Sequence, residues 1–356
     1  MAGYLTCPRR QPACRGRVQR FVRLAVLTAF VFGLAATSGA AALEPGRSIR
    51  VPLPVRDLAF TSGSVAWEHA PGVPAAVIPG REGTCGQVGL WLPASRRQWR
   101  FDPTLVCTNG PSSTGMGIRD VSVATRRVLW IEYVGGNFRD WFLVTASTTK
   151  PKPLRLRHVI RDVDAEPPFV IGPGTPAGIP YAVDDEVGYL GDTGAVLFTK
   201  TVASPVRALA AGVGPRRLRV AALLANGTIV GLDGRGHTVQ VIPPQGVVSA
   251  IRVSSLGIAV QRGRMNRGFV VPYPKIAIGT RTVRLPAGAH MVDVAQGRVL
   301  WTDDGDLGVT VIASGRRTRL ANGSPESRVL GQLETSALVW ARGRGLYWDA
   351  GVIRSS

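Results

Sequence analysis

The sequence lacks the patterns of long helices and of common catalytic motifs. Beyond residue 43 no long stretch repeats apolar residues at i, i+3, i+4 and i+7, so we expect little helix. No G-x-S-x-G nucleophile elbow and no H-E-x-x-H zinc motif is present. The histidines are far apart in the chain, at His69, His158, His237 and His290. These absences argue against familiar hydrolases and zinc enzymes, although a site assembled from several loops would leave no linear motif.

Acidic residues and lysines are also scarce. The chain has 43 Lys and Arg against 23 Asp and Glu, a net charge of +20, and its only lysines are Lys150, Lys152, Lys200 and Lys275. A basic exported protein meets anionic wall polymers, lipid head groups or nucleic acid, so a polyanion is one possible partner. The arginines are scattered, however, and a bias toward arginine is also typical of a GC-rich genome. The sequence has no motif for specific nucleic-acid binding.

The N-terminus has the organisation of a signal peptide. Six arginines and no acid precede the apolar run Leu24–Ala36, and small residues follow, ending in Ala40-Ala41-Ala42. Signal peptidase requires such small side chains. We therefore predict a cleaved signal peptide over 1–42 and one extracytoplasmic domain over 43–356, which keeps a net charge of +14 without the six arginines. The alternative is an uncleaved membrane anchor, because the segment is just long enough to span a bilayer.

Cysteine is rare, and its placement suits an exported protein. Cys7 and Cys14 lie in the expected leader, which leaves Cys85 and Cys107 in the mature chain. Redox-active pairs usually occur as C-x-x-C, and that spacing is absent. Exported proteins meet oxidising surroundings, so we predict a structural disulfide between Cys85 and Cys107. It would contribute about 3 kcal/mol in the chain-entropy model.

A strand pattern recurs along the chain. The stretch RVLWTDDGDLGVTVI (298–312) has an apolar strand that contains Trp301, then a polar turn and a second apolar strand. Two aliphatic residues, or Val-Ala, also precede Trp67, Trp130 and Trp340, each about ten residues after an aliphatic strand begins. We assign weaker copies of the unit to stretches with Tyr189, Ala222 and Val260 at the aromatic position.

The repeat length predicts the fold. Later copies follow one another at about 40 residues, the length of one propeller blade of four short antiparallel strands. We attribute two longer intervals to Gly/Pro-rich insertions at 69–86 and 167–180. The chain is therefore expected to be all-β, a β-propeller of about seven four-stranded blades after the signal peptide.

Outer strands and ring closure can be predicted from alternation. A half-exposed strand alternates apolar with polar residues. Five stretches do so and are expected to be fourth strands: 97–102, 154–158, 238–242, 282–286 and 317–320. The segment SIRVPLP (48–54) is similar, and we predict that it pairs with the last blade near Leu346–Trp348. Such pairing would close the ring and cover a sheet edge.

The repeated strands also carry a family resemblance. The VAW, VLW and LVW strands, the D-x-G and N-G hairpins and the leader resemble exported bacterial β-propellers of the TolB-like and WD40-like kind. The resemblance extends over 48–354 and is one of repeat style, since the Gly-His and Trp-Asp dipeptides of WD40 repeats occur once each, at Gly236-His237 and Trp348-Asp349. It implies a scaffold or a module that binds proteins or wall components.

Two acidic groups are candidate sites. Asp303-Asp304-Gly305-Asp306 contains calcium-ligating residue types but lacks a distal bidentate acid. Asp-Gly between apolar strands is a strong hairpin signal, so we interpret this stretch as a turn. The run Asp162–Glu166, with Asp184-Asp185-Glu186, is the densest group of carboxylates. It has the residue types of a cation pocket or an acid/base pair, and a solvated loop is the simpler interpretation.

These features predict an exported protein that binds or scaffolds at the cell envelope. Its partner would be an unidentified protein or envelope component, with no cofactor and with membrane contact only through an uncleaved N-terminus. Two alternatives stay open: a propeller hydrolase or lyase with a cation in its central channel, and binding of an anionic wall polymer or other polyanion. The sequence assigns no catalytic and no metal-binding residue.

Overall fold

We describe the protein from a computed structural model. The described residues are 47–50, 55–61, 64–69, 88–92, 97–101, 116–150, 152–321, 329–333, 338–342 and 345–349. All of them belong to one unit of the chain, Leu43–Ser356. The signal peptide expected over 1–42 and the disulfide expected between Cys85 and Cys107 lie outside the described residues and stay predictions. Among the described residues, no helix is long and apolar enough to cross a membrane.

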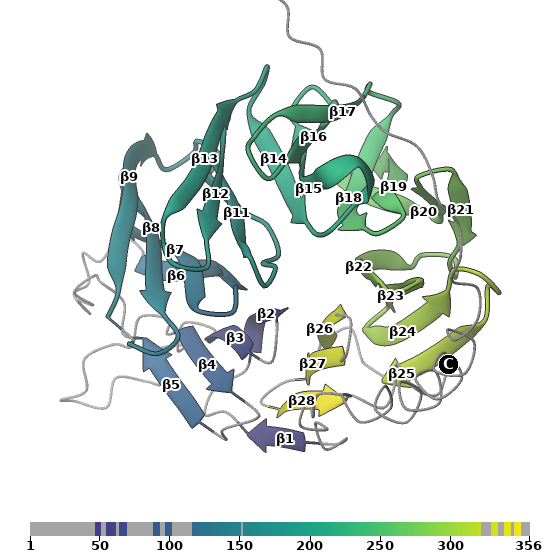
Figure 1. Cartoon of the computed structure of the whole chain (residues 1–356), viewed down its shortest axis with the longest axis horizontal. Coiled ribbons are helices and arrows are strands. Elements are labelled where there is room, and N and C mark those ends of the chain that lie inside the picture. Colours follow the sequence, from purple (N-terminus) through teal and green to yellow (C-terminus); the bar gives the residue numbers. More distant parts are fainter. Residues whose placement is uncertain are drawn as a thin grey trace, which may run out of the picture. The chain divides into compact units, whose positions relative to one another are not determined.

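Seven four-stranded antiparallel sheets contain the strands (Figure 1). We number them as blades 1 to 7 in chain order. Blades 1 to 3 are β2–β5 (Val55–Thr61, Ser64–His69, Val88–Leu92, Arg97–Phe101), β6–β9 (Met116–Val123, Arg127–Gly135, Phe138–Ser147, Leu154–Asp162) and β10–β13 (Phe169–Ile171, Gly178–Val183, Glu186–Gly191, Val196–Thr201).

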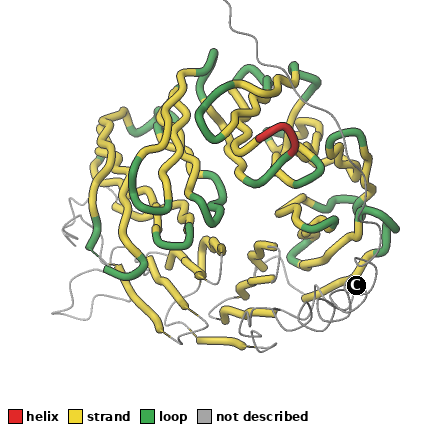
Figure 2. Tube along the Cα trace, viewed as in Figure 1, coloured by secondary structure: helices red, strands yellow, loops and turns green. Residues whose placement is uncertain are grey.

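The remaining blades repeat this order. Blades 4 to 6 are β14–β17 (Val206–Ala211, Leu218–Leu224, Ile229–Asp233, Thr238–Ile242), β18–β21 (Val247–Ser254, Gly257–Asn266, Phe269–Ile278, Arg281–Arg284) and β22–β25 (His290–Ala295, Arg298–Asp303, Asp306–Val311, Arg317–Ala321). Blade 7 combines β26–β28 (Val329–Leu333, Leu338–Arg342, Gly345–Asp349) with β1 (Arg47–Arg50). The helical content of the described residues is one 3-10 turn, η2 (Pro215–Arg217), red in Figure 2.

The sheets form a closed ring, so the predicted β-propeller is confirmed with seven blades. The first strand of each blade contacts the first strand of the next, from β2 with β6 through β22 with β26, and β26 contacts β2. Each described hydrophobic cluster combines side chains of two neighbouring blades. A blade is thus buried on both faces, which explains why its second strand reads aliphatic-aliphatic-Trp. Trp130, fully buried, lies 5.6 Å from the Phe101 ring of blade 1.

The ring closes as the alternating N-terminal segment predicts. Strand β1 pairs antiparallel with β28, and Ser48 and Ile49 lie opposite Tyr347 and Leu346. The pairing covers Arg47–Arg50, so it begins one residue before the predicted segment. The first strand of the described chain therefore completes the last blade, and the edge of β28 is covered.

The outer strands also lie where alternation places them. The five expected stretches correspond to β5, β9, β17, β21 and β25, each the fourth strand of its blade. In β9 most side chains are exposed, with half-buried residues between them. One face of these strands therefore meets solvent, as their arginine-rich alternation indicates.

The aromatic position predicted for blade 3 is wrong. Tyr189 lies in the third strand, β12, and the second strand β11 carries Tyr181 instead. The 167–180 segment is not an insertion, because it contains the first strand β10. In register, Tyr181 faces Gly188 just as Trp301 faces Gly308, and both rings occupy the space that a glycine Cβ would need. This correction brings the third interval near the ~40-residue repeat.

Two blades have unusually long second and third strands. In blade 2 the hairpin β7–β8 has strands of 9 and 10 residues, and in blade 5 the hairpin β19–β20 has two strands of 10 residues. Every blade of a propeller has the same orientation, so hairpins between second and third strands all lie on one face of the ring. We call this the hairpin face.

Candidate functional site

The acidic stretch of blade 6 is a hairpin turn. Asp303 pairs with Asp306, and Asp304 and Gly305 between them have φ values of 47° and 89°. Two positive φ values are the type I′ geometry for which Asp-Gly is favoured. The Asp306 carboxylate lies 3.0 Å from the Arg319 guanidinium. The geometry agrees with the turn interpretation.

The carboxylates of the second acidic group, Asp162–Glu166 with Asp184-Asp185-Glu186, include two that pair with arginines and one that accepts a hydrogen bond within a turn. Asp184 pairs with Arg161 of blade 2, and Glu186 lies 3.6 Å from Arg157. The Asp162 carboxylate accepts the backbone N–H of Asp164 at 3.0 Å, as in a tight turn. Within the described residues no three His, Cys, Asp or Glu side chains gather as metal ligands would.

The described histidines contact single carboxylates or solvent. The His158 ring lies 2.6 Å from Asp140 and stacks on Phe142 at 4.6 Å. His237 lies 3.2 Å from Asp233, whose carboxylate also accepts the backbone N–H groups of Arg235 and His237. Burial alone would raise the pKa of Asp233, but these hydrogen bonds outweigh it and the pKa lies below its usual value. His290 is exposed, and the His69 side chain lies outside the described set.

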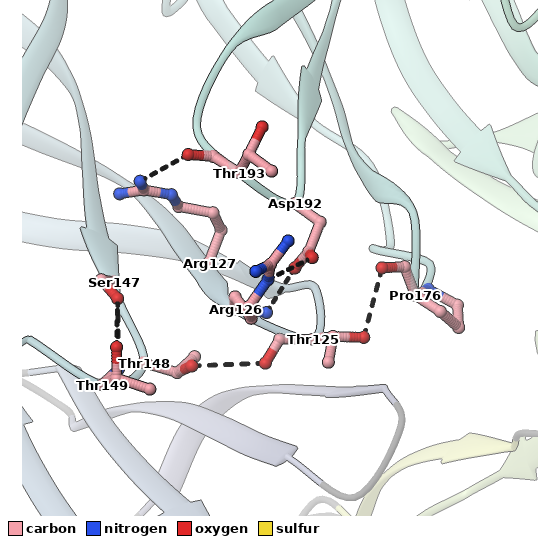
Figure 3. Close-up of polar contacts among 9 residues, drawn as sticks. All are labelled: Thr125, Arg126, Arg127, Ser147, Thr148, Thr149, Pro176, Asp192 and Thr193. Carbon is pink, nitrogen blue, oxygen red and sulfur yellow. Dashed lines mark hydrogen bonds and ion pairs between the residues drawn. The ribbon is translucent and has the colours of Figure 1, made fainter.

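An exposed polar seam joins blades 2 and 3 (Figure 3). Asp192 accepts from the Arg126 guanidinium at 2.7 Å, and the Thr193 carbonyl accepts from Arg127 at 2.8 Å. The Thr125 hydroxyl donates to the Pro176 carbonyl at 3.2 Å. Nearby, the Thr148 hydroxyl donates to the Thr125 carbonyl at 3.3 Å, and the Ser147 and Thr149 hydroxyls lie 3.0 Å apart, so these contacts fix the adjoining loop of blade 2. Each contact across the seam joins the two blades, so we assign it to ring stability.

A second set of contacts ties the first strands of blades 5, 6 and 7. Arg252 on β18 donates to the Val292 carbonyl at 2.6 Å and lies 3.9 Å from the Asp293 carboxylate. Asp293 also accepts the backbone N–H of Leu333 on β26 at 2.9 Å. One carboxylate thus bridges three blades, which is again a structural role.

Blade 5 is the most unusual surface, because it has no acidic residue. No Asp or Glu occurs between Asp233 and Asp293. Its cations are Arg252, Arg262, Arg264, Arg267, Lys275, Arg281 and Arg284. Arg262 is half-buried and those after it are exposed. In the described part of the chain, Arg252 is the one member of this set that forms an ion pair. Blade 5 therefore presents uncompensated positive charge.

A depression of about 470 Å³ opens on this blade. Its lining residues are Val260, Arg262, Tyr273, Pro274, Lys275, Ile276, Ala277 and Thr282. The register of β19 and β20 explains it: Gln261 faces Ile276 and Gly263 faces Pro272, so three residues of β20 stand opposite Arg262 alone. Such a bulge bends the strand and opens the sheet. The lining combines two cations, a phenol and a hydroxyl with apolar walls, which is the chemistry of a site for an anionic group.

Arg262 is held in a fixed position beside this depression. Its guanidinium donates to the Gln245 side chain at 3.0 Å, in the loop that joins blades 4 and 5. Its Nε is buried and has no hydrogen-bond partner among the residues that the structure describes. A buried donor without a partner is costly, so an added acceptor here would be favourable.

The tip of the β19–β20 hairpin exposes large apolar side chains. Phe269 is 76% exposed, Met265 56% and Tyr273 46%. The pairing of β18 with β19 reaches Gly263 of β19, and the pairing of β21 with β20 begins at Lys275 of β20. The tip of the hairpin therefore extends beyond both neighbouring strands. Exposed aromatic and Met side chains among arginines are typical of a binding surface.

The sequence predictions missed this site, although a signal was present. The cations of blade 5 form no cluster in the sequence, because they are widely spaced between Arg252 and Arg284. The informative pattern is the missing acid over the whole interval from Asp233 to Asp293. That interval contains the whole of blade 5, from Val247 to Arg284, so the absence includes one complete structural unit.

Comparison with known proteins supports the fold. No protein-family model and no curated protein matches the chain. A chain in the crystal structure of a mitotic checkpoint complex matches with a TM-score of 0.51 and 15% identity, covering 86% of this chain and 95% of that one. The Neurospora crassa Pan2 WD40 domain matches with a TM-score of 0.51 and 12% identity, covering 86% and 96%. At these identities the likeness is one of fold: a WD40-like β-propeller.

Proposed function

We propose that this protein is an exported binding or scaffolding module that engages a protein partner at the cell envelope through its hairpin face. The observation that carries the proposal is the pair of long hairpins, each with a strongly exposed Phe at the first residue of its third strand. Phe138 is 66% exposed on β8 and Phe269 is 76% exposed on β20. Exposed aromatic residues beside arginines are enriched in protein interfaces and in their energetic centres.

The cellular part of the proposal rests on the N-terminal sequence. A basic segment, an apolar run and the Ala40-Ala41-Ala42 site have the order of a signal peptide. The TolB-like style of the strands supports the same setting. Mass determination of the mature protein from the envelope and medium fractions tests it: a chain that begins after Ala42 is expected, and a full-length chain in the cytoplasm would contradict it.

The binding part is tested by comparing variants. Phe138→Ser with Phe269→Ser should lose partners that the wild-type protein retains from an envelope extract, measured by quantitative mass spectrometry. Val196→Ser with Leu197→Ser is the matched control, since these side chains are exposed on the outer strand β13. The control should retain the same proteins as the wild type. Identical sets for all three proteins would overturn the proposal.

A further inference from the structure

We propose that blade 5 recognises an acidic, apolar-containing segment of the partner protein, with a carboxylate in the depression lined by Arg262 and Lys275 and an apolar side chain against Phe269. This inference rests on the proposed function and specifies the chemistry of its partner. Three features of the blade carry it: its charge, the arrangement of its side chains and the apolar character of its tip.

Blade 5 contains no acidic residue that could compensate the positive charge of its arginines and lysine. Arg264, Arg267, Lys275, Arg281 and Arg284 are exposed, and among the described residues none of them has a carboxylate within ion-pairing distance. Like charges on one sheet repel each other, and an anionic partner would reduce that repulsion. The same positive charge would also speed the association of an anionic partner with the site. An acidic ligand is therefore the complementary one.

The register places the relevant side chains on one side of the hairpin. Side chains alternate along a strand, so Val260, Arg262 and Arg264 share a side of β19. Arg264 lies opposite Val271 and Asn266 opposite Phe269, which puts Phe269 on that same side. Val260 packs in the cluster between blades 4 and 5, so this side faces blade 4.

The opposite side of the hairpin is engaged with blade 6. Gln261 is fully buried, its amide donates to the Ala289 carbonyl at 2.7 Å, and its side-chain oxygen accepts the Met291 N–H at 2.7 Å. Arg262, Arg264, Phe269 and the depression therefore lie on one surface, the side of the hairpin toward blade 4. We call it the blade 5 groove.

The apolar side chains favour a peptide over an anionic polymer. A polymer of phosphate or sulfate groups would use the cations and would gain little from Phe269. Pro272 and Pro274 remove two backbone donors from the part of β20 that lacks a neighbouring outer strand, so strand addition is disfavoured. Recognition by side chains remains: a carboxylate for the cations and an apolar residue for Phe269.

Fluorescence anisotropy with labelled peptides tests the inference on the folded, full-length mature protein. One peptide is ten residues of Asp and Glu with a central Leu-Phe pair, and the second has Ser-Gly in place of Leu-Phe. The wild-type protein should bind the first peptide more tightly than the second. Affinity for the first should fall steeply between 50 and 200 mM salt, as expected of charge-dependent binding.

Exposed residues provide variants that keep the fold. Arg264→Glu with Lys275→Glu should weaken binding of the first peptide at least about tenfold, and Phe269→Ser should bring its affinity down to that of the second peptide. Lys150→Glu with Lys152→Glu, the same charge change in the exposed β8–β9 connection, is the matched control and should bind like the wild type. Arg262→Gln, a milder change in the depression itself, should weaken binding about fivefold.

Several outcomes would overturn the inference. These are no binding of either peptide, equal loss in the Lys150/Lys152 control, or equal affinity for both peptides and for heparin with no effect of Phe269→Ser. The last would indicate a polyanion site. If Phe138→Ser with Phe269→Ser loses cellular partners while Arg264→Glu with Lys275→Glu retains them, the inference fails and the proposed function stands. If neither variant loses a partner, the proposed function fails.

Discussion

Blades 2 and 5 both have a long hairpin on the hairpin face, but the partners of their charged side chains differ. In blade 2 the arginines are engaged with acids or aromatic rings: Arg119 with Asp120, Arg157 with Glu186, Arg161 with Asp184, Arg139 over Tyr133 and Arg155 over Phe142. In blade 5 the arginines beyond Arg252 form no ion pair with any described residue. Engaged charges hold neighbouring strands and blades, whereas unpaired ones are available to a ligand.

The two hairpins also differ in their support. Strand β6 pairs with β7 as far as Val134, and β9 pairs with β8 as far as Phe138, so the blade 2 hairpin lies within its sheet. In blade 5 the last residues of β19 and the first residues of β20 pair with each other and with no other described strand. The tip of the hairpin is therefore flanked by other strands in blade 2, whereas in blade 5 it extends beyond them.

The largest expected effect compares the cores of these blades. Trp130 and Val260 occupy the same place in the second strand, and both are buried between blades. Trp130→Ala should lower the free energy of unfolding by about 4 kcal/mol, because it leaves a large cavity and removes the indole N–H that donates to Glu132 at 2.8 Å. Val260→Ala should cost about 2 kcal/mol. Urea unfolding measures both, and equal costs would contradict the larger contribution of the buried indole at Trp130.

A smaller effect compares the arginines. Arg161→Ala breaks the ion pair with Asp184 between blades 2 and 3, and its partly exposed geometry predicts a loss of stability below about 1 kcal/mol. Arg264→Ala removes no described partner and should leave the unfolding midpoint unchanged, while it weakens binding to the acidic peptide. Arg161→Ala should leave peptide binding unchanged. These results together would establish that Arg161 stabilises the fold and that Arg264 binds the ligand. A lower unfolding midpoint in Arg264→Ala would contradict this division of roles.

Much of the fold could be predicted from the sequence because burial between blades imposes a period. Trp67, Trp130, Trp301 and Trp340 mark second strands, and arginine alternation marks fourth strands such as β21. Even the closing pair β1–β28 follows from one alternating segment. These features depend on local side-chain patterns, and such patterns are visible in a single sequence.

The failures have physical causes as well. The prediction for blade 3 fails because the first strand, β10, has only three residues and lies among Gly and Pro residues. The second strand β11 therefore resembles a first strand in the sequence, and Tyr189 takes the aromatic position that belongs to Tyr181. The blade 5 groove was missed because its bulge depends on the register between Gln261 and Ile276, which no linear motif encodes. Its charge was visible only as an absence of acids. Sites formed by register and by uncompensated charge require the sheet to be known first.

The smallest effect concerns pH and again separates the two regions. Tyr181 is buried between blades 2 and 3, and burial raises its pKa above the usual 10.0 in spite of the nearby Arg157. Above about pH 10 the unfolded chain ionises this phenol while the folded protein keeps it neutral, so the free energy of unfolding falls as the pH rises toward the folded pKa. Tyr181→Phe removes this contribution. Between about pH 9 and about pH 11, around the ordinary phenol pKa, the free energy of unfolding of this variant should decline less than that of the wild type. A decline in Tyr181→Phe as steep as that of the wild type would contradict this prediction.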